Sequence, residues 1–271
     1  MQVLRSILDF NIWRESVASG LKVGFVPTMG ALHAGHASLL ERARRENDFV
    51  VLSIFVNPTQ FNQASDFEKY PHTWAADLEV ARTSGVDVIF YPENPEVIYP
   101  EGYRFEVREK EFSKSLCGEF RPGHFEGVLT VVMKLLNLVR ADSAYFGEKD
   151  FQQFSLIRDM ARDFFMRTKI VPCSTAREQS GLAMSSRNMR LSDSGKERAA
   201  AIYETLLSAS SPSEGREKLQ RLGFEVEYFE EKNGRRFVAA WLEGVRLIDN
   251  VDYAHTTLNR RNPQRTSEAI L

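Results

Sequence analysis

Two histidines, His33 and His36, lie in the segment that is richest in residues able to do chemistry, residues 27–36 (PTMGALHAGH). Its glycines, Gly30 and Gly35, would let backbone N–H groups come close to a ligand. A helix that begins near His36 would present unpaired N–H donors and roughly half a positive charge to a phosphate. Because the histidines are three residues apart, one helical turn could direct both toward the same anion. An isolated pair of this kind is an incidental polar cap as often as a ligand site, so a ligand site is predicted only if a second element supports it.

A polar loop at residues 183–188 (AMSSRN) is that second element. Ser185, Ser186 and Arg187 supply hydrogen-bond donors, and Arg187 could strengthen its contacts as charge develops on a departing pyrophosphate. By itself such a loop is more often a solvated surface segment. The sequence has no Walker-type phosphate loop, so a bound nucleotide would be held by this loop together with residues 29–36, here called the histidine turn.

The elements that must position these residues appear as apolar runs that alternate with helical patterns. Strands are expected at 21–26, 49–56, 86–91, 143–146 and 169–172, and helices at 36–46, 74–83, 125–139 and 150–165. Strands that are apolar on both faces are typical of a parallel sheet covered by helices on each side. We therefore predict an α/β fold with a Rossmann-like, doubly wound parallel sheet.

The pattern changes after Arg190. The later residues indicate a helix cap, a polar break, an exposed strand and a hairpin with a two-residue turn, at Ser192-Asp193, 208–215, 224–229 and 237–248 (turn Glu243-Gly244). We expect a Rossmann-like domain in residues 1–177 and a smaller C-terminal α+β domain in residues 178–271, which includes the polar loop.

Composition excludes several classes of protein. The 271 residues are 43% hydrophobic, enough for a sizeable core, and 35 basic against 37 acidic residues create no general field for nucleic acid. Cys117 and Cys173 lack metal-type spacing and are expected to be small buried or partly buried residues rather than a disulfide. The chain starts with no secretory pattern and has no apolar run of bilayer length. We expect a cytoplasmic protein that binds neither membranes nor nucleic acid.

Five separated motifs resemble those of one enzyme family. The histidine turn and the polar loop are similar to the HIGH-type and KMSKS-type elements that close on ATP in class I nucleotidyltransferases. Three further motifs, NPTQF, RPGHF and GEKDFQQ at residues 57–61, 121–125 and 147–153, match the pantothenate synthetase family in order and spacing. Weaker similarity runs through Trp241-Leu242 and residues 246–250, so the resemblance covers most of the chain.

The resemblance implies an ATP-dependent ligase. In this family the pantoate carboxylate attacks the α-phosphorus of ATP, and the β-alanine amine then displaces AMP from pantoyl adenylate, which gives pantothenate. The catalytic residues that it implies are His33, His36, Lys149 and Arg187. The ATP contacts that it implies are Met29, Gly30, Ala31, Leu32, His33, Ala34, Gly35, His36, Gly147, Glu148, Lys149, Asp150, Ala176, Met184, Ser185, Ser186 and Arg187. Gln60 would bind both pantoate and β-alanine, and Gln153 would bind pantoate.

The same resemblance implies ATP as co-substrate with Mg²⁺, no organic prosthetic group, a homodimer, and a C-terminal domain that closes over the active site. We expect no protein metal ligand. Three roles have two readings each: His36 donates either a proton or only a hydrogen bond, Asn57 binds substrate or orients its loop, and Arg121 with His124 borders the site or caps a helix. His72 and His255 belong to no motif and are expected to be surface or structural residues.

The chain departs from the family's pattern at a few positions, where Ser180 precedes Gly181, Ala76 precedes Asp77, and Pro172 comes about two residues early. Because Pro172 comes early, the backbone near Ala176 is expected to be shaped differently from that of the family. A related adenylyltransferase acting on another acceptor would share the histidine turn but not NPTQF with GEKDFQQ. An aminoacyl-tRNA synthetase fits less well because the tail is short and not strongly basic. A non-catalytic nucleotide-binding protein of the same fold is the alternative from another class.

Overall fold

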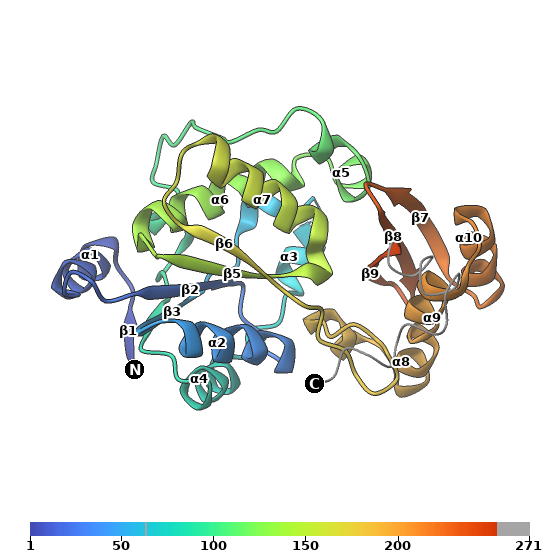
Figure 1. Ribbon diagram of the computed structural model, residues 1–271, viewed down its shortest axis with the longest axis horizontal. Coiled ribbons are helices and arrows are strands. Elements are labelled where there is room, and N and C mark those ends of the chain that lie inside the picture. Colours follow the sequence, from blue (N-terminus) through green and yellow to red (C-terminus); the bar gives the residue numbers. More distant parts are fainter. Residues whose placement is uncertain (63, 254–271) are drawn as a thin grey trace, which may run out of the picture. The chain divides into compact units, whose positions relative to one another are not determined.

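The computed structural model describes residues 1–62 and 64–253 and divides into two compact units, Met1–Ala176 and Arg177–Leu271 (Figure 1). This division lies one residue before the boundary expected at 177. His255 and the rest of residues 254–271 lie outside the described part. No helix within that part is both long enough and apolar enough to cross a membrane.

The first unit is built on a parallel sheet whose strand order is β1-β4-β3-β2-β5-β6. Its strands are β1 (Gln2–Leu4), β2 (Val23–Thr28), β3 (Phe49–Ile54), β4 (Val88–Phe90), β5 (Ser143–Gly147) and β6 (Lys169–Cys173). From β2 the chain builds outward through β3 and β4, and it then returns to place β5 on the other side of β2. Ligands of open α/β sheets bind outside the carboxyl ends of the strands at such a reversal.

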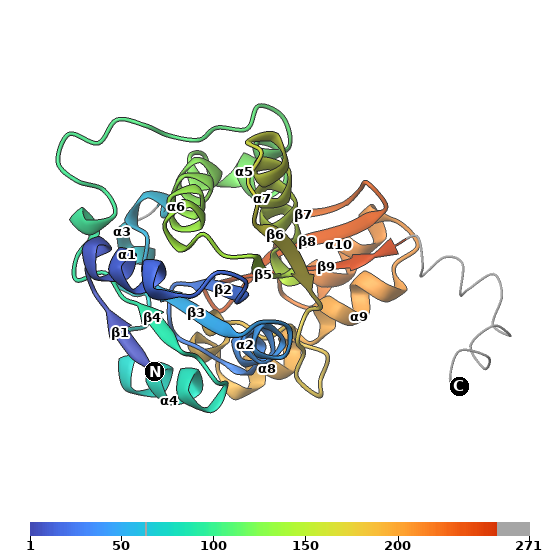
Figure 2. The same cartoon turned by 60° about the vertical axis from the view of Figure 1, so that its left-hand side comes forward.

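Helices cover both faces of this sheet, so the predicted doubly wound α/β class is confirmed. Helices α6 and α7 lie on one side, and α2 and α4 lie on the other (Figure 2). The helices of this unit are α1 (Ile7–Ser16), α2 (Ala34–Glu46), α3 (Ala64–Glu68), α4 (Trp74–Thr83), α5 (Cys117–Phe120), α6 (His124–Val139) and α7 (Phe151–Asp163). Strand β4 is buried along its whole length, as expected for a strand covered on both faces. Cys117 and Cys173 are both buried free thiols, as predicted.

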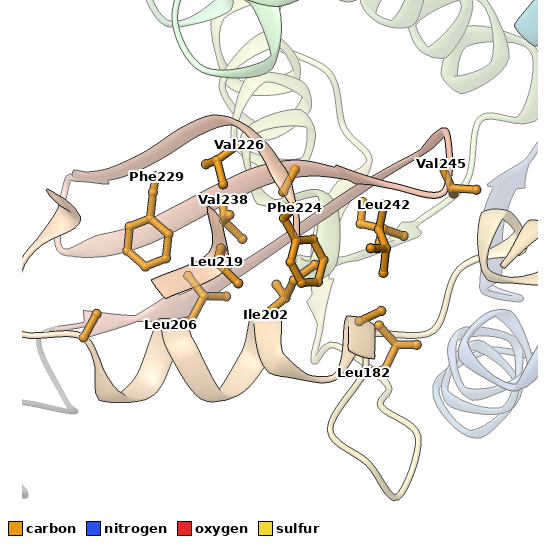
Figure 3. Packing of buried hydrophobic residues seen from close by; sticks show 14 of the residues in the cluster. Leu182, Ile202, Leu206, Leu219, Phe224, Val226, Phe229, Val238, Leu242 and Val245 are labelled. Carbon is orange, nitrogen blue, oxygen red and sulfur yellow. The ribbon is translucent and has the colours of Figure 1, made fainter. Parts of the chain in front are cut away.

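The second unit has its own core. Strands β7 (Glu225–Lys232), β8 (Arg235–Leu242) and β9 (Val245–Asp252) form an antiparallel sheet, and helices α8 (Asp193–Ala199), α9 (Ala201–Ser208) and α10 (Pro212–Arg221) accompany it. Leu206 and Leu219 from the helices meet Val238 and Phe229 from the strands (Figure 3). The hairpin expected at Glu243-Gly244 is present, and both residues have the positive φ of the turn type that suits a two-residue loop.

Several elements differ from the expectations, and helices α1, α3 and α5 are among those that were not predicted. Strand β1 was not foreseen because it is a short edge strand with mostly exposed side chains. The polar break expected at 208–215 is shorter than predicted, since α9 ends at Ser208 and α10 begins at Pro212. Ser211 caps this helix by accepting the Glu214 N–H at 3.2 Å, and Gly215 lies where the helix meets the Phe229 ring. Serine, proline and glycine thus serve the start and packing of a helix here.

Helix α6 passes very close to the short helix η1 (Pro58–Gln60) at Gly127. A Cβ on Gly127 would lie 2.5 Å from the Thr59 carbonyl oxygen. This contact is to the backbone, which cannot rotate away as a side chain can. We expect Gly127→Ala to lower the melting temperature by about 2–6 °C, because overpacking of about 1–3 kcal/mol outweighs the better helix propensity of alanine.

The matched control for this substitution is Gly147→Ala. Gly147 has φ −73°, and nothing lies within 4 Å of a Cβ built on it. Its melting temperature, followed by circular dichroism, should stay at the wild-type value. Equal melting temperatures for the wild type and Gly127→Ala would contradict the close contact.

Candidate active site

The candidate site lies at the carboxyl ends of β2 and β5, where the strand order reverses. Strand β2 leads into the histidine turn and α2, and β5 leads into the short helix η4 (Glu148–Asp150). The two strands are adjacent and parallel. The fold therefore places the histidine turn and η4 next to each other at the edge of the sheet where open α/β folds bind ligands.

His33 and His36 begin helix α2 through a reciprocal pair of hydrogen bonds. His33 is the N-cap residue, and its Nδ1 accepts the Gly35 N–H at 3.1 Å, while Nδ1 of His36 accepts the His33 N–H at 3.3 Å. The ring centroids are 4.1 Å apart. Since both Nδ1 atoms are acceptors, each neutral ring carries its proton on Nε2, which is its remaining donor.

The surroundings of the two rings favour the neutral form. Burial lowers the pKa of His33 to about 4, with a smaller contribution from the charge of Lys149. Burial also lowers the pKa of His36 to about 3, assisted by His33 and Lys149. At neutral pH each ring is therefore a hydrogen-bond donor through Nε2–H. Of the two readings left open for His36, this geometry favours hydrogen-bond donation.

The backbone of the histidine turn differs from the expectation that its glycines expose N–H groups to a ligand. The Gly30 N–H is bound by Thr28 Oγ1 at 3.2 Å and the Gly35 N–H by His33. The N–H groups of residues 31 and 32 are bound by the Asp77 carboxylate. These backbone donors are paired within the protein, because a buried N–H needs an acceptor, and each imidazole keeps its Nε2–H as a further donor.

The charges of Lys149 and Asp150 reach the His33 imidazole, where Lys149 lowers the pKa and Asp150 raises it. Lys149 Nζ is 3.8 Å from an Asp150 carboxylate oxygen. Ala176 is also close, because its Cβ lies 3.5 Å from where a Cβ on Gly35 would be. The structure thus brings together the expected residues of the histidine turn, η4 and position 176.

Gln60 is joined to the histidine turn through its side-chain amide. Its Nε2 donates to Met29 Sδ at 3.1 Å, and its Oε1 accepts from Asn57 Nδ2 at 3.0 Å. Asn57 is 1% exposed, caps η1 and also accepts from Tyr99 Oη at 3.0 Å. These bonds support the reading of Asn57 as the residue that orients the loop. They leave Gln60 with a second amide hydrogen and a second acceptor position for a substrate.

Arg121 and His124 act on the main chain of Gln60. Arg121 Nη1 lies 3.2 Å from His124 Nε2, and because a guanidinium can only donate, this Nε2 is the acceptor. His124 therefore carries its proton on Nδ1, which donates to the Gln60 carbonyl at 2.8 Å. The N-cap of α6 is Gly123, which has no side-chain cap. His124 therefore borders the residue expected to bind substrate and does not cap the helix.

The remaining expected residues fall outside this cluster. Gln153 is half-buried on α7, and no hydrogen bond within the described residues joins it to the histidine turn. Its neighbour Gln152 ties α7 to the 112–117 segment through three hydrogen bonds. Residues 184–187 belong to the second unit, where Ser185 caps a short helix by accepting the Arg187 N–H at 3.2 Å. The approach of this loop to the histidine turn stays a prediction.

Possible metal ligands and two residues outside the predicted motifs, Asp77 and Tyr99, remain to be placed. The described residues contain no group of three or more His, Cys, Asp or Glu side chains that could hold a metal ion. His72, expected to be a surface or structural residue, is exposed. The sequence predicted no role for Asp77, which was noted only because Ala76 precedes it, and none for Tyr99. The signal for Asp77 was an acidic residue one helical turn before the buried Ala81, on the apolar face of α4.

The lowered histidine pKa values predict a pH dependence of stability. Below pH 6.5 the unfolded chain binds protons that the folded rings do not bind until about pH 4 and pH 3, so stability rises with pH across this range and falls on acidification. In His36→Asn, the amide oxygen can still accept the His33 N–H but does not titrate. We expect the loss of melting temperature between pH 7 and about pH 4 to become shallower in this variant.

His72→Asn is the control, because it removes an exposed histidine outside the site. Thermal unfolding of the wild type and both variants at a series of pH values measures the effect. If His36→Asn loses stability on acidification as steeply as the wild type does, the neutral capping arrangement is wrong.

Known proteins with similar sequences cover nearly the whole chain. The pantothenate synthetase of Bdellovibrio bacteriovorus is 54% identical over 250 residues, which are 92% of this chain and 98% of that protein. That of Legionella pneumophila (strain Lens) is 48% identical over 92% of this chain and 99% of its own length.

Solved structures of the same kind of protein are similar to this chain in fold as well. The crystal structure of the pantoate-beta-alanine ligase from Francisella tularensis, in complex with beta-gamma ATP and beta-alanine, has a TM-score of 0.89 at 44% identity. It covers 93% of this chain and 98% of its own. The pantothenate synthetase of Thermus thermophilus has a TM-score of 0.86 at 38% identity, over 93% and 99% of the two chains. The family description "Pantoate-beta-alanine ligase" matches residues 2–252, and the chain belongs to this family.

Proposed function

We propose that this protein condenses pantoate with β-alanine at the expense of ATP, and so makes pantothenate, a precursor of coenzyme A, together with AMP and diphosphate. It is a ligase that forms an amide bond. The observation that carries the proposal is the pair of neutral imidazoles at the reversal of the sheet, whose Nδ1 atoms cap helix α2 and whose pKa values burial and the charge of Lys149 lower. The relatives that share this sequence are pantothenate synthetases, one of them described with ATP and β-alanine bound.

The first step is attack of the pantoate carboxylate on the α-phosphorus of ATP. An oxygen–phosphorus bond forms, the bond to the β-phosphate breaks, and diphosphate leaves. A carboxylate is nucleophilic at neutral pH, so the task of the protein is to align the groups and neutralise phosphate charge. In the proposal, Lys149 supplies fixed charge, His33 and His36 donate hydrogen bonds, and Arg187 contacts the departing diphosphate.

The second step is attack of the neutral β-alanine amine on the acyl carbon of pantoyl adenylate. The carbon–nitrogen bond forms, AMP leaves, and the amine loses a proton. Gln60 suits both substrates, because its amide can donate to a carboxylate and accept from a hydroxyl or an amine without burying another charge. Its bonds to Met29 and Asn57 hold that amide in one orientation. Gln153 is proposed as the second amide for pantoate.

Several further features belong to the same proposal. ATP enters as its magnesium complex, which needs few direct protein ligands, and no organic prosthetic group takes part. The smaller C-terminal domain brings residues 184–187, including Met184 and Ser186, over the site, while Gly147, Glu148 and Ala176 border the nucleotide. We also propose a cytoplasmic homodimer, for which light scattering is the direct test.

The reaction is tested by mass detection of pantothenate and AMP after mixing the protein with ATP, Mg²⁺, pantoate and β-alanine. Diphosphate release should depend on pantoate. Release that ignores pantoate but responds to another acceptor would identify a different adenylyltransferase, and ATP binding without release would identify a non-catalytic protein.

Lys149→Ala should separate catalysis from folding. Two opposite charges about 4 Å apart at an effective dielectric near 20 are worth about 4 kcal/mol, so we expect adenylate formation to fall by at least about 100-fold. The melting temperature should stay within a few degrees of the wild type. Lys169→Ala is the control, because it removes an exposed lysine at the start of β6, the opposite end of the sheet. Near-wild-type turnover of Lys149→Ala would refute its assignment.

A further inference from the structure

Asp77 is a buried carboxylate that binds the backbone of the histidine turn. It lies on α4 and is 2% exposed. One carboxylate oxygen accepts the Ala31 N–H at 3.1 Å, and the other accepts the Leu32 N–H at 2.7 Å and the Thr73 hydroxyl at 3.1 Å. A buried charge is costly unless it is hydrogen-bonded. These three donors therefore explain how the carboxylate is kept at this place.

The backbone that Asp77 binds has an unusual conformation. Gly30 and Ala31 have φ values of +84° and +51°, and the second is a left-handed conformation that costs an alanine free energy. A Cβ on Gly30 would lie 3.0 Å from an Asp77 oxygen and 3.1 Å from Ile54 Cγ2. The turn thus lies in close contact with the Asp77 carboxylate, and its strained conformation is stabilised by the contacts with Asp77 and Ile54.

Successive backbone N–H groups that converge on one point form a concavity that binds anions such as phosphate. In this turn the concavity at residues 31 and 32 is filled by the protein's own anion. The next residue, His33, caps α2, and its imidazole packs on that of His36. The orientation of both Nε2–H groups therefore depends on how residues 30–32 are held.

We propose that Asp77 is a positioning residue for ATP: it occupies the inward backbone donors of the histidine turn, so that the imidazoles of His33 and His36, and not the main chain, meet the phosphates. This proposal rests on the function proposed above. It differs from a metal-binding role, in which Asp77 would contact the magnesium of ATP. It also differs from a simple charge effect, in which loss of the nearby anion would tighten ATP binding.

The test is Asp77→Asn. Asparagine offers one acceptor oxygen, and its NH₂ group would face a second N–H donor, so the turn should loosen without loss of volume. We expect kcat/KM for ATP to fall roughly 10- to 100-fold, and ATP affinity, measured by calorimetry with Mg²⁺, to weaken. The KM values for pantoate and β-alanine should change less than about twofold, because Asn57 and His124, which lie outside the turn, also hold Gln60.

Asp142→Asn is the matched control. The Asp142 carboxylate accepts the Val23 N–H at 2.8 Å, which is a bond of the same kind at the amino end of β2. Its kcat/KM for ATP should stay within about twofold of the wild type. Thr73→Val is a milder variant that keeps the carboxylate and removes one donor to it. It should weaken ATP use in the same direction by a few-fold, and it serves if Asp77→Asn does not fold.

The outcomes separate the alternatives. Tighter ATP binding, a defect repaired by raised Mg²⁺, or equal losses in the use of all three substrates would each overturn the positioning role. Calorimetry with ATP also separates the two proposals. A wild type that binds ATP but does not consume pantoate refutes the proposed function and still allows Asp77 to be tested, whereas a wild type that binds no ATP refutes both.

Discussion

The hydrogen bonds that begin helix α2 are made by the same imidazoles that face the candidate site, and the rest of the site depends on this double use. Because each Nδ1 accepts a backbone N–H, each ring has a defined tautomer and a defined direction for its Nε2–H. A second proton on either ring would break the start of the helix. The two rings are therefore constrained to be neutral donors, and positive charge at the site has to come from elsewhere.

This constraint gives a division of labour among the residues. In the proposed mechanism Lys149 provides charge from η4, while the two imidazoles provide directed donors from α2. The negative charge of Asp77 is bound by the backbone N–H groups of residues 31 and 32. A nucleophile that is already a carboxylate needs no general base, so such a site can act by alignment and by neutralising phosphate charge.

Gln60, which is proposed to bind substrate, is held by a chain of amide and imidazole hydrogen bonds. Helix α6 binds the Gln60 main chain through His124, and Asn57 binds its side chain. The close passage of α6 at Gly127 brings these groups within reach. An amide held at both its main chain and its side chain loses little conformational freedom when substrate binds, which favours specificity.

The sequence by itself determined the fold class and the order of elements, because hydrophobic periodicity is local and strands apolar on both faces require helices on each side. Helix α4 occupies the expected residues 74–83. The sequence also identified the family, since five motifs spread along the chain match the family's motifs in order. Elements whose signals are weak, such as β1 and the serine-, proline- and glycine-rich start of α10, did not stand out from loops.

Only the tertiary structure decided which atoms face the site. The motif located His33 and His36, but their tautomers follow from bonds that form when the helix begins. Asp77 is 46 residues from Ala31, and His124 is 64 residues from Gln60. Hydrogen bonds between groups so far apart in the chain exist only after the sheet brings its helices together, so no local pattern could reveal that Asp77 binds the backbone of the histidine turn.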